Sequence, residues 1–329
     1  MIALTDNKAL HVTNGSSACQ QLASAVIEGA CLAWDDPLHH GPVIGDLQLR
    51  DHSAIRAKFI VECGWESAGE AEQRFAARDS RLHQAQGEIV LWSSPELYDQ
   101  LHLLQILSWL STQGSRDVRV VWLSFLFSDH NEESLIHALA DREPVTTEQV
   151  NLATTLWSLF GSNRPDRLAA RISKPLPGLP YMQSALRRFC AEFPHVGSGL
   201  SQTQQHILQI ISERSGIRPG PLFRSVSERE DVPFMGDWSF WLEVAEMAEG
   251  NAPLIRCDGG EPFVYPPQTA ADAPRFSDQS LVLTGLGRRV LGGQADWLMD
   301  HAPNKWLGGT HLRPGAVWRF DPTAETIIS

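Results

Sequence analysis

Lysine is nearly absent from this chain: four lysines stand among 329 residues, which include 39 aspartates and glutamates. The formal net charge is −12 at pH 7. Because phosphate binding draws on clustered Lys and Arg, this balance argues against a broad nucleic-acid-binding face. A small molecule or a protein is the expected partner.

Long hydrophobic runs are also lacking. No apolar stretch approaches the ~18 residues that indicate a membrane-spanning helix. The first residues, MIALTDNKALHV, have no basic start, long apolar core or small-residue cleavage site, so we predict no signal peptide. The expected location is the cytoplasm, without a membrane contact.

Cysteines are few and scattered, and none forms a CxxC pair. An odd, dispersed set predicts buried thiols in a reducing compartment and argues against a disulfide framework or a zinc ribbon. The five are Cys19, Cys31, Cys63, Cys190 and Cys257.

The first part of the chain alternates strand-like and helix-like segments, which predicts βα units around a parallel sheet. Short, unbroken apolar runs suit strands that are buried on both faces. The expected strands are residues 10–12, 31–34, 89–92 and 118–123. We therefore predict an α/β fold with a Rossmann-like domain over residues 1–143.

Two further domains are expected. Residues 144–199 form a helical connector, whose first helix opens with the capping-box sequence Thr146–Gln149. Residues 200–329 contain three helices followed by short β-like pieces, the order of a winged-helix domain with a β tail.

The charges of this last domain argue against DNA binding. Residues 200–300 contain 8 Arg, no Lys and 14 acidic residues, a net charge of 8 − 14 = −6. Its third helix, residues 236–249, has four acidic residues and no basic one. Phosphate would repel it, so nucleic acid is an improbable ligand. A protein partner or a homodimer is the alternative use of this surface.

The first candidate site is the turn Asn14–Gly15–Ser16–Ser17, between the first strand and its helix. Free backbone N–H groups at a helix start favour an anion, and Gly15 permits close backbone approach. The pattern lacks the lysine and further glycines of a phosphate loop. Simple helix capping by Ser16 or Ser17 remains the alternative.

The second candidate site is the segment Asp35–Pro42, which follows the second strand. It places two carboxylates and two imidazoles within six residues, and Pro37, Gly41 and Pro42 restrict its shape. We predict acid–base catalysis by Asp36 with His39 or His40. No second cluster completes a ligand set, so no metal is predicted.

The third candidate site is Ser94–Gln100, after the third strand. Tyr98, Asp99 and Gln100 are predicted to orient a ligand, although carboxylates in a first helical turn also stabilise the helix dipole. Ligands of open α/β sheets bind at the carboxyl ends of the strands, so the three loops are expected to form one pocket. His311, in the C-terminal tail, is a further candidate that would close it.

The chain resembles a bacterial family known as domain of unknown function eighteen thirty-five, with an uncharacterised companion domain at its C-terminus. The resemblance implies a bacterial source and a full-length two-domain organisation, and it brings no established reaction. The family pattern often has an acid where this chain has Ser16. The resembling stretches are LHVTNGSS, WDDPLHHGPV, LWSSPELYDQLHLLQIL, GLSQTQQHIL, FMGDWSFW, LTGLGRRVLGG and WLGGTHL.

Together these features predict an enzyme, a hydrolase or group transferase, that acts on a small anionic or nucleotide-like ligand. No redox-cofactor motif is present, and no cofactor can be named. The competing hypothesis is a non-catalytic ligand sensor or adaptor that binds a protein partner through its acidic winged-helix-like domain.

Overall fold

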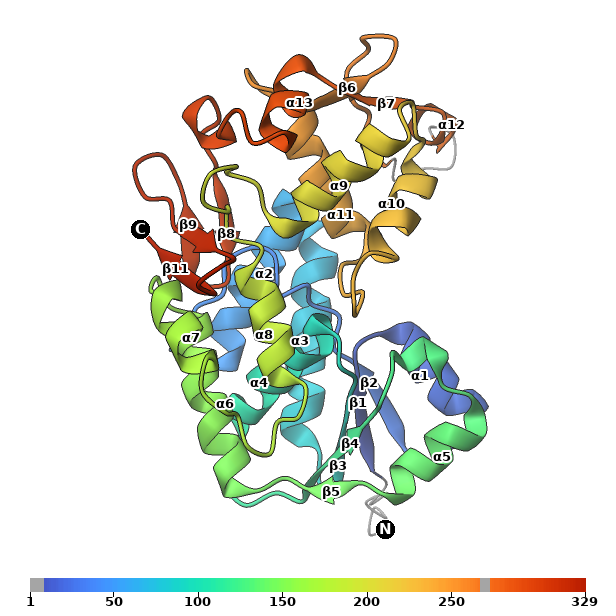
Figure 1. The fold of residues 1–329 in the computed structure, drawn as a ribbon. Helices are drawn as coiled ribbons and strands as arrows, with labels where there is room; N and C mark the ends of the chain where they lie inside the picture. The colour runs from blue at the N-terminus through green and yellow to red at the C-terminus, as the bar shows by residue number, and fades with distance from the viewer. Residues whose placement is uncertain (1–8, 267–272) are drawn as a thin grey trace. The chain divides into compact units, whose positions relative to one another are not determined.

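The structure, a computed structural model, describes residues 9–266 and 273–329 and has a mixed α/β fold. The chain divides into two compact units, residues 1–186 and 187–329 (Figure 1). Helix α8 (Met182–Cys190) spans the boundary between them.

The first unit contains a five-stranded sheet with the order β2-β1-β3-β4-β5. The neighbours among β1 to β4 pair in parallel, and β5 pairs with β4 antiparallel. The α/β class and the mostly parallel sheet are therefore confirmed. The strands are β1 (Leu10–Thr13), β2 (Ala30–Ala33), β3 (Ile89–Ser93), β4 (Val118–Trp122) and β5 (Glu143–Pro144).

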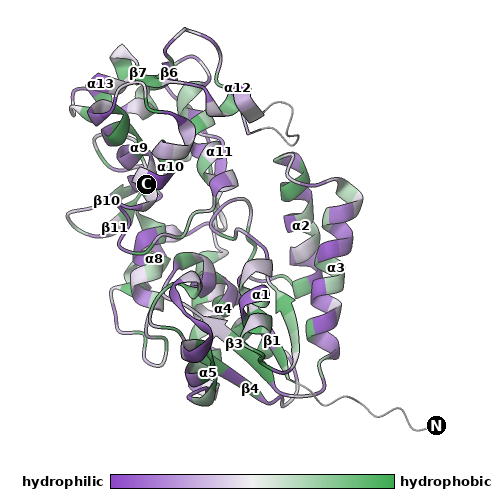
Figure 2. Ribbon diagram, turned by 90° about the vertical axis from the view of Figure 1, so that its right-hand side faces the viewer, coloured by the Kyte–Doolittle hydropathy of each residue, from purple (hydrophilic) through white to green (hydrophobic). Residues whose placement is uncertain are grey.

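Helices cover both faces of this sheet (Figure 1). On one face, Trp92 of β3 packs in a buried cluster with Leu22 of α1 and Leu135 of α5. All five residues of β3 are buried, as the apolar runs predict, and Figure 2 shows β1, β3 and β4 as hydrophobic strands. The helices are α1 (Ser16–Ser24), α2 (Leu49–Glu62), α3 (Ala68–Gln84), α4 (Leu97–Leu110), η1 (Phe127–Asp129), α5 (Glu132–Ala140), α6 (Thr147–Phe160) and α7 (Pro165–Ile172).

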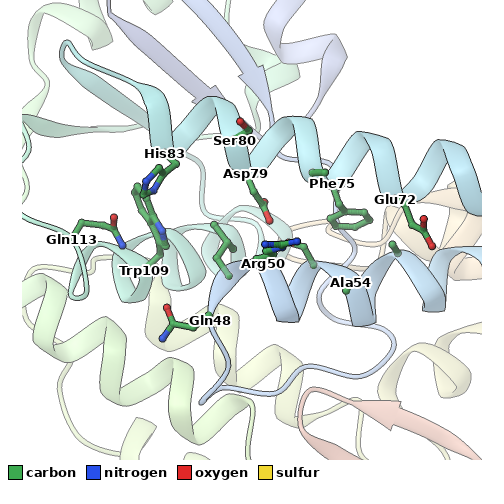
Figure 3. Close-up of a pocket in the computed structure, with 14 residues that line it drawn as sticks. Gln48, Arg50, Ala54, Glu72, Phe75, Asp79, Ser80, His83, Trp109 and Gln113 are labelled. Atoms are coloured by element: carbon green, nitrogen blue, oxygen red, sulfur yellow. The ribbon is translucent and has the colours of Figure 1, made fainter.

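Helices α2 and α3 run side by side, and residues from both line an open groove (Figure 3). Helix α3 begins with a capping box between Ser67 and Glu70. Helix α2 begins after Gln48, which makes no side-chain cap.

The second unit contains three helices followed by small antiparallel strand pairs around one apolar core. A capping box at Thr146 begins α6, as the sequence predicts, and a second capping box at Ser201 begins α9. The elements are α9 (Gln202–Glu213), α10 (Pro219–Ser227), α11 (Asp237–Ala248), β6 (Ile255–Cys257), α12 (Ala273–Ser277), β7 (Leu281–Leu283), α13 (Gly285–Leu291), η2 (Trp297–Met299), β8 (Lys305–Leu307), β9 (Thr310–Leu312), β10 (Arg319–Asp321) and β11 (Thr326–Ile328). Over residues 9–266 and 273–329, no helix has the length and apolar character needed to cross a membrane.

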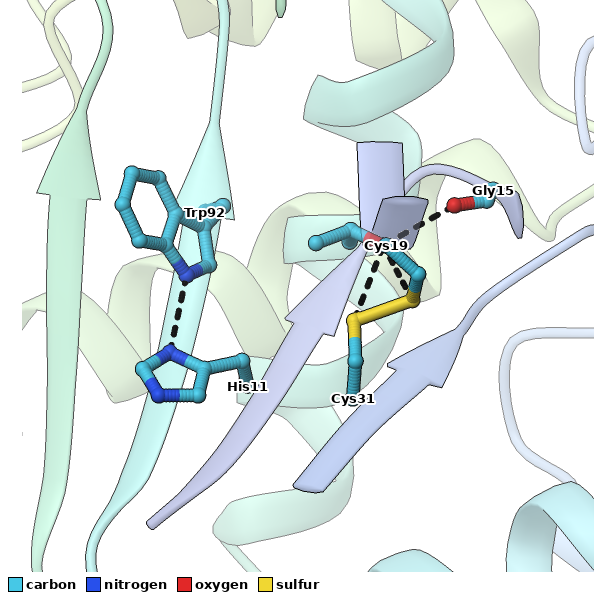
Figure 4. The surroundings of a disulfide bond; sticks show 6 residues. His11, Gly15, Cys19, Cys31 and Trp92 are labelled. Carbon is cyan, nitrogen blue, oxygen red and sulfur yellow. Dashed lines mark hydrogen bonds between the residues drawn. A yellow bond between two sulfur atoms is a disulfide. The ribbon is translucent and has the colours of Figure 1, made fainter. Parts of the chain in front are cut away.

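A disulfide joins Cys19 of α1 to Cys31 of β2, which corrects the expectation that every cysteine is a thiol (Figure 4). The Cα atoms of the pair lie 5.7 Å apart, within the usual range for a disulfide. Helix α1 follows β1 and packs against the neighbouring strand β2. This packing brings Cys19 and Cys31, which are 12 residues apart in the sequence, into contact. Cys63, Cys190 and Cys257 are free.

Replacing both bonded cysteines with serine is expected to lower the free energy of unfolding by about 3 kcal/mol, since a cross-link over so short a loop restricts the unfolded chain by that amount. Urea unfolding of Cys19→Ser/Cys31→Ser measures the loss. Cys63→Ser is the matched control and should retain the wild-type midpoint. If wild type, Cys19→Ser/Cys31→Ser and Cys63→Ser all unfold at the same urea concentration, the prediction of a stabilising disulfide is wrong.

Candidate functional site

The candidate site lies where the direction of strand connection reverses. From β1 the chain crosses to β2 on one side, and it then returns to β3 on the other side of β1. This reversal separates the loops at the carboxyl ends of β1 and β3, which is where open α/β sheets bind ligands. The loops that follow β1, β2 and β3 are the three predicted from the sequence.

A hydrogen bond bridges the reversal point: Asn14 Nδ2 donates to Glu96 Oε1 at 2.6 Å. Asn14 follows β1, and Glu96 is the residue before α4. The loops after β1 and β3 are thus in direct contact.

Three carboxyl groups lie in the loops at this edge of the sheet, Asp35 directly after β2 and the interacting pair Glu96 and Asp99 after β3, and we call them the carboxyl cluster. Burial and the neighbouring charge of Asp99 raise the pKa of Glu96 well above its usual range. Burial raises the pKa of Asp99 to about 6, although the Ser94 backbone N–H donates to Asp99 Oδ2 at 2.8 Å. Two carboxyls in contact resist double ionisation, which favours the protonated form of Glu96.

Asp35 lies directly over the turn after β1. Burial raises its pKa, while Arg74 and a hydrogen bond with Ser16 act in the opposite direction. A side chain at Gly15 would place its Cβ 2.8 Å from Asp35 Oδ1, so glycine leaves the room that this carboxyl occupies. Ser16 and Ser17 are exposed at the start of α1.

Tyr98 connects the carboxyl cluster to the segment after β2. Burial and the surrounding carboxylates, Asp35 first among them, raise its pKa well above the usual range, so the phenol stays protonated. Its ring lies 4.4 Å from that of His102 and 6.0 Å from that of His39.

Asp36 is fully buried and ion-paired. Arg56 Nε and Nη2 each lie 2.8 Å from Asp36 Oδ1, and Arg78 Nη1 lies 4.0 Å from Oδ2. Burial alone would raise the pKa of Asp36, but the two guanidinium groups outweigh it and hold the pKa below its usual value. This geometry suits a structural counter-ion better than an acid–base catalyst.

The predicted histidines lie in the same buried segment. His39 is 2% and His40 7% exposed, and their ring centroids are 5.1 Å apart. The carbonyl oxygen of His40 accepts a hydrogen bond from Arg56 Nη1 at 2.7 Å, which fixes the turn. Asp36 and His39 are three residues apart in the sequence, and both side chains are buried.

Gln100 supports the loop after β3 instead of facing its surface. Its Nε2 donates to Ser93 Oγ at 2.8 Å and to the Ser94 carbonyl at 2.6 Å. His311 lies on β9 of the second unit, where its ring stacks on Trp306 and its Nε2 is 2.8 Å from Asn304 Oδ1. Its part in a ligand site remains a prediction.

Sequence reasoning did not select two carboxylates of the cluster, Asp35 and Glu96. Both carried a signal: Asp35 follows the second strand directly, and Glu96 precedes the third strand's helix. No group of three or more His, Cys, Asp or Glu able to hold a metal ion occurs in the part of the chain that the structure describes.

Comparison with protein-family models gives no match, and no curated protein matches the sequence. The resemblance stated above therefore remains a prediction, and the site is interpreted from its own geometry.

Asp36→Asn is expected to lower the free energy of unfolding by about 3–5 kcal/mol, because it leaves the buried Arg56 guanidinium without its counter-ion. Chemical denaturation at pH 7 measures this loss. Asp129→Asn, the same change at an exposed position, should differ from wild type by less than about 0.5 kcal/mol. A loss at Asp36 as small as that of the control would show the ion pair to be unimportant.

The raised pKa of Asp99 predicts a pH-dependent stability. Its folded pKa of about 6 exceeds the usual 3.8, so its contribution is fully present below pH 3.8 and is lost as pH rises through 6. The expected loss is on the order of 2 kcal/mol, and Asp99→Asn should abolish it. Unfolding free energies measured at pH 4, 5, 6 and 7 show how stability changes with pH. If the unfolding free energy of Asp99→Asn falls with pH as steeply as that of wild type, the pH dependence does not come from Asp99.

Proposed function

We propose that the first unit is a hydrolase or group transferase for a small nucleotide-like ligand, bound at the carboxyl edge of its sheet. The observation that carries the proposal is the Asn14–Glu96 hydrogen bond at the reversal point, with raised carboxyl pKa values on both sides. Clusters of groups with perturbed pKa values are typical of catalytic sites. The strand order supports a Rossmann-like interpretation of this unit.

The ligand class follows from the positions of the polar groups. Asp35 stands after the second strand, 35 − 15 = 20 residues beyond Gly15, the spacing at which an acid binds a ribose hydroxyl in dinucleotide folds. The exposed Ser17 can donate to an anionic group at the start of α1, whereas the Ser16 hydroxyl is already shared with Asp35. A polyanion would be repelled by the charges of Asp35 and Asp99, so the hydroxyl-bearing part of the ligand belongs beside Asp35.

We assign a role to each member of the carboxyl cluster. Glu96, protonated near neutral pH, donates its proton to the leaving group as general acid. Asp35 accepts a proton from the attacking water or hydroxyl, which forms the new bond as the old one breaks. Asp99 keeps Glu96 protonated through its charge. Asp36 with His39 or His40, the pair expected from the sequence, is less suited because Asp36 is committed to two arginines.

The test begins with native mass spectrometry of the purified protein and liquid chromatography of adenosine nucleotides incubated with it. Glu96→Gln should reduce turnover at least roughly a hundredfold, because the general acid is lost while its size is kept. Asp99→Asn should move the high-pH limb of the rate profile to lower pH, because a neighbouring negative charge is removed.

Glu133→Gln, at an exposed helix position, is the matched control and should retain full turnover. Equal turnover in Glu96→Gln and Glu133→Gln would reject the catalytic assignment. A bound nucleotide without turnover would favour the sensor hypothesis instead.

The second unit keeps the adaptor hypothesis open. An isolated bridge from Ile217 to Leu281 adds a third piece beside the β6–β7 pair, and this helix–strand order supports a winged-helix-like interpretation. The negative charge of helix α11 is partly neutralised by Lys305, however. Lys305 Nζ lies 3.0 Å from Glu243 Oε2 and 2.8 Å from Glu246 Oε2, so those two charges are unavailable to a partner.

A further inference from the structure

A groove of about 750 Å³ runs along α2 and α3 of the first unit, with the end of α4 closing one side (Figure 3). None of its lining residues belongs to the carboxyl cluster or to the three loops at the sheet edge. A volume of this size accommodates a typical small-molecule ligand. The groove is therefore a separate candidate binding site.

Small side chains create the space. The groove is lined by Ala54 and Ala57 of α2 and by Ala76 and Ser80 of α3, which fill less space than larger side chains would. Phe75 lies beneath the groove and is 1% exposed, which gives the channel a firm apolar floor.

One end of the groove is aromatic. Trp109 and His83 stand there together, with ring centroids 6.4 Å apart and an edge-to-face geometry (Figure 3). The Arg116 guanidinium lies 5.2 Å from the Trp109 ring and is fixed by hydrogen bonds to the carbonyls of Ala85 and His83. This end offers flat surfaces for a planar ring, under a positive potential.

A cation stands in the middle of the groove. In Figure 3 the Arg50 side chain lies beside Asp79, but Asp79 is already bound by Arg78 Nε and Nη2 at 2.9 and 2.8 Å. Among the described residues, Arg50 forms no ion pair. The Arg50 guanidinium is thus available to an anionic group on a ligand, while Glu72 at the far end disfavours a second one.

We propose that this groove binds a flat aromatic or heteroaromatic acid. The ring system lies against Trp109 and His83, the acidic group pairs with Arg50, and the apolar part covers Phe75 between the alanines. The inference concerns a second ligand and does not depend on the reaction at the sheet edge.

The probe for the test is 8-anilinonaphthalene-1-sulfonate, an aromatic sulfonate, titrated by fluorescence into the full-length protein. We expect saturable binding that Arg50→Glu weakens at least roughly tenfold, because attraction becomes repulsion. Ala76→Phe, which fills the channel, should also weaken binding by that factor. N-phenyl-1-naphthylamine, the same rings without the sulfonate, should bind with an affinity that Arg50→Glu leaves unchanged.

Arg81→Glu is the matched control, the same charge reversal at an exposed position of α3 outside the groove, and should bind the sulfonate as wild type does. Unfolding midpoints of all variants verify the fold. The proposal is overturned if Arg50→Glu and Arg81→Glu weaken binding equally, if Ala76→Phe leaves it unchanged, or if the neutral probe responds to Arg50→Glu as the sulfonate does.

Discussion

The first unit depends on one buried charge, the Asp36 carboxylate enclosed by Arg56 and Arg78. Arg56 also donates to the carbonyls of Pro37, His40 and Pro42, so it fixes the whole segment after β2. Arg78 reaches Ser53 of α2 and stacks over the Trp34 ring at 3.9 Å. A single anion therefore joins the sheet edge to the helix pair that lines the groove.

The same charge pairing explains why the carboxyl cluster is poised for proton transfer. Arg56 and Arg78 are paired with Asp36, and among the residues that the structure describes no cation pairs with Glu96 or Asp99, which have hydrogen-bond donors instead. Their burial then raises both pKa values. Two adjacent aspartates, Asp35 and Asp36, thus have opposite shifts, because one faces the arginines and the other faces the turn at Gly15.

Apolar runs and turn residues were enough to predict the strands, the parallel sheet and the loops that meet at its edge. They were insufficient to separate Asp35 from Asp36, because that choice depends on how the chain leaves β2. The Cys19–Cys31 bond was equally hidden, since it needs the pairing of β1 with β2, where His11 stands opposite Cys31, and the return of α1 onto that pair. Gln100 looked like a ligand group, but its partners are Ser93, the last residue of β3, and Ser94, the first residue of the loop that follows.

The short fifth strand has a consequence for association between molecules. An open sheet edge presents unpaired N–H and C=O groups that can recruit a strand from another chain. Here one edge is β5, only two residues long and ending in Pro144, which has no N–H to offer. The opposite edge is the four-residue β2, tethered to α1 through Cys31. Neither edge is a good template for a further strand, so the sheet resists edge-to-edge aggregation.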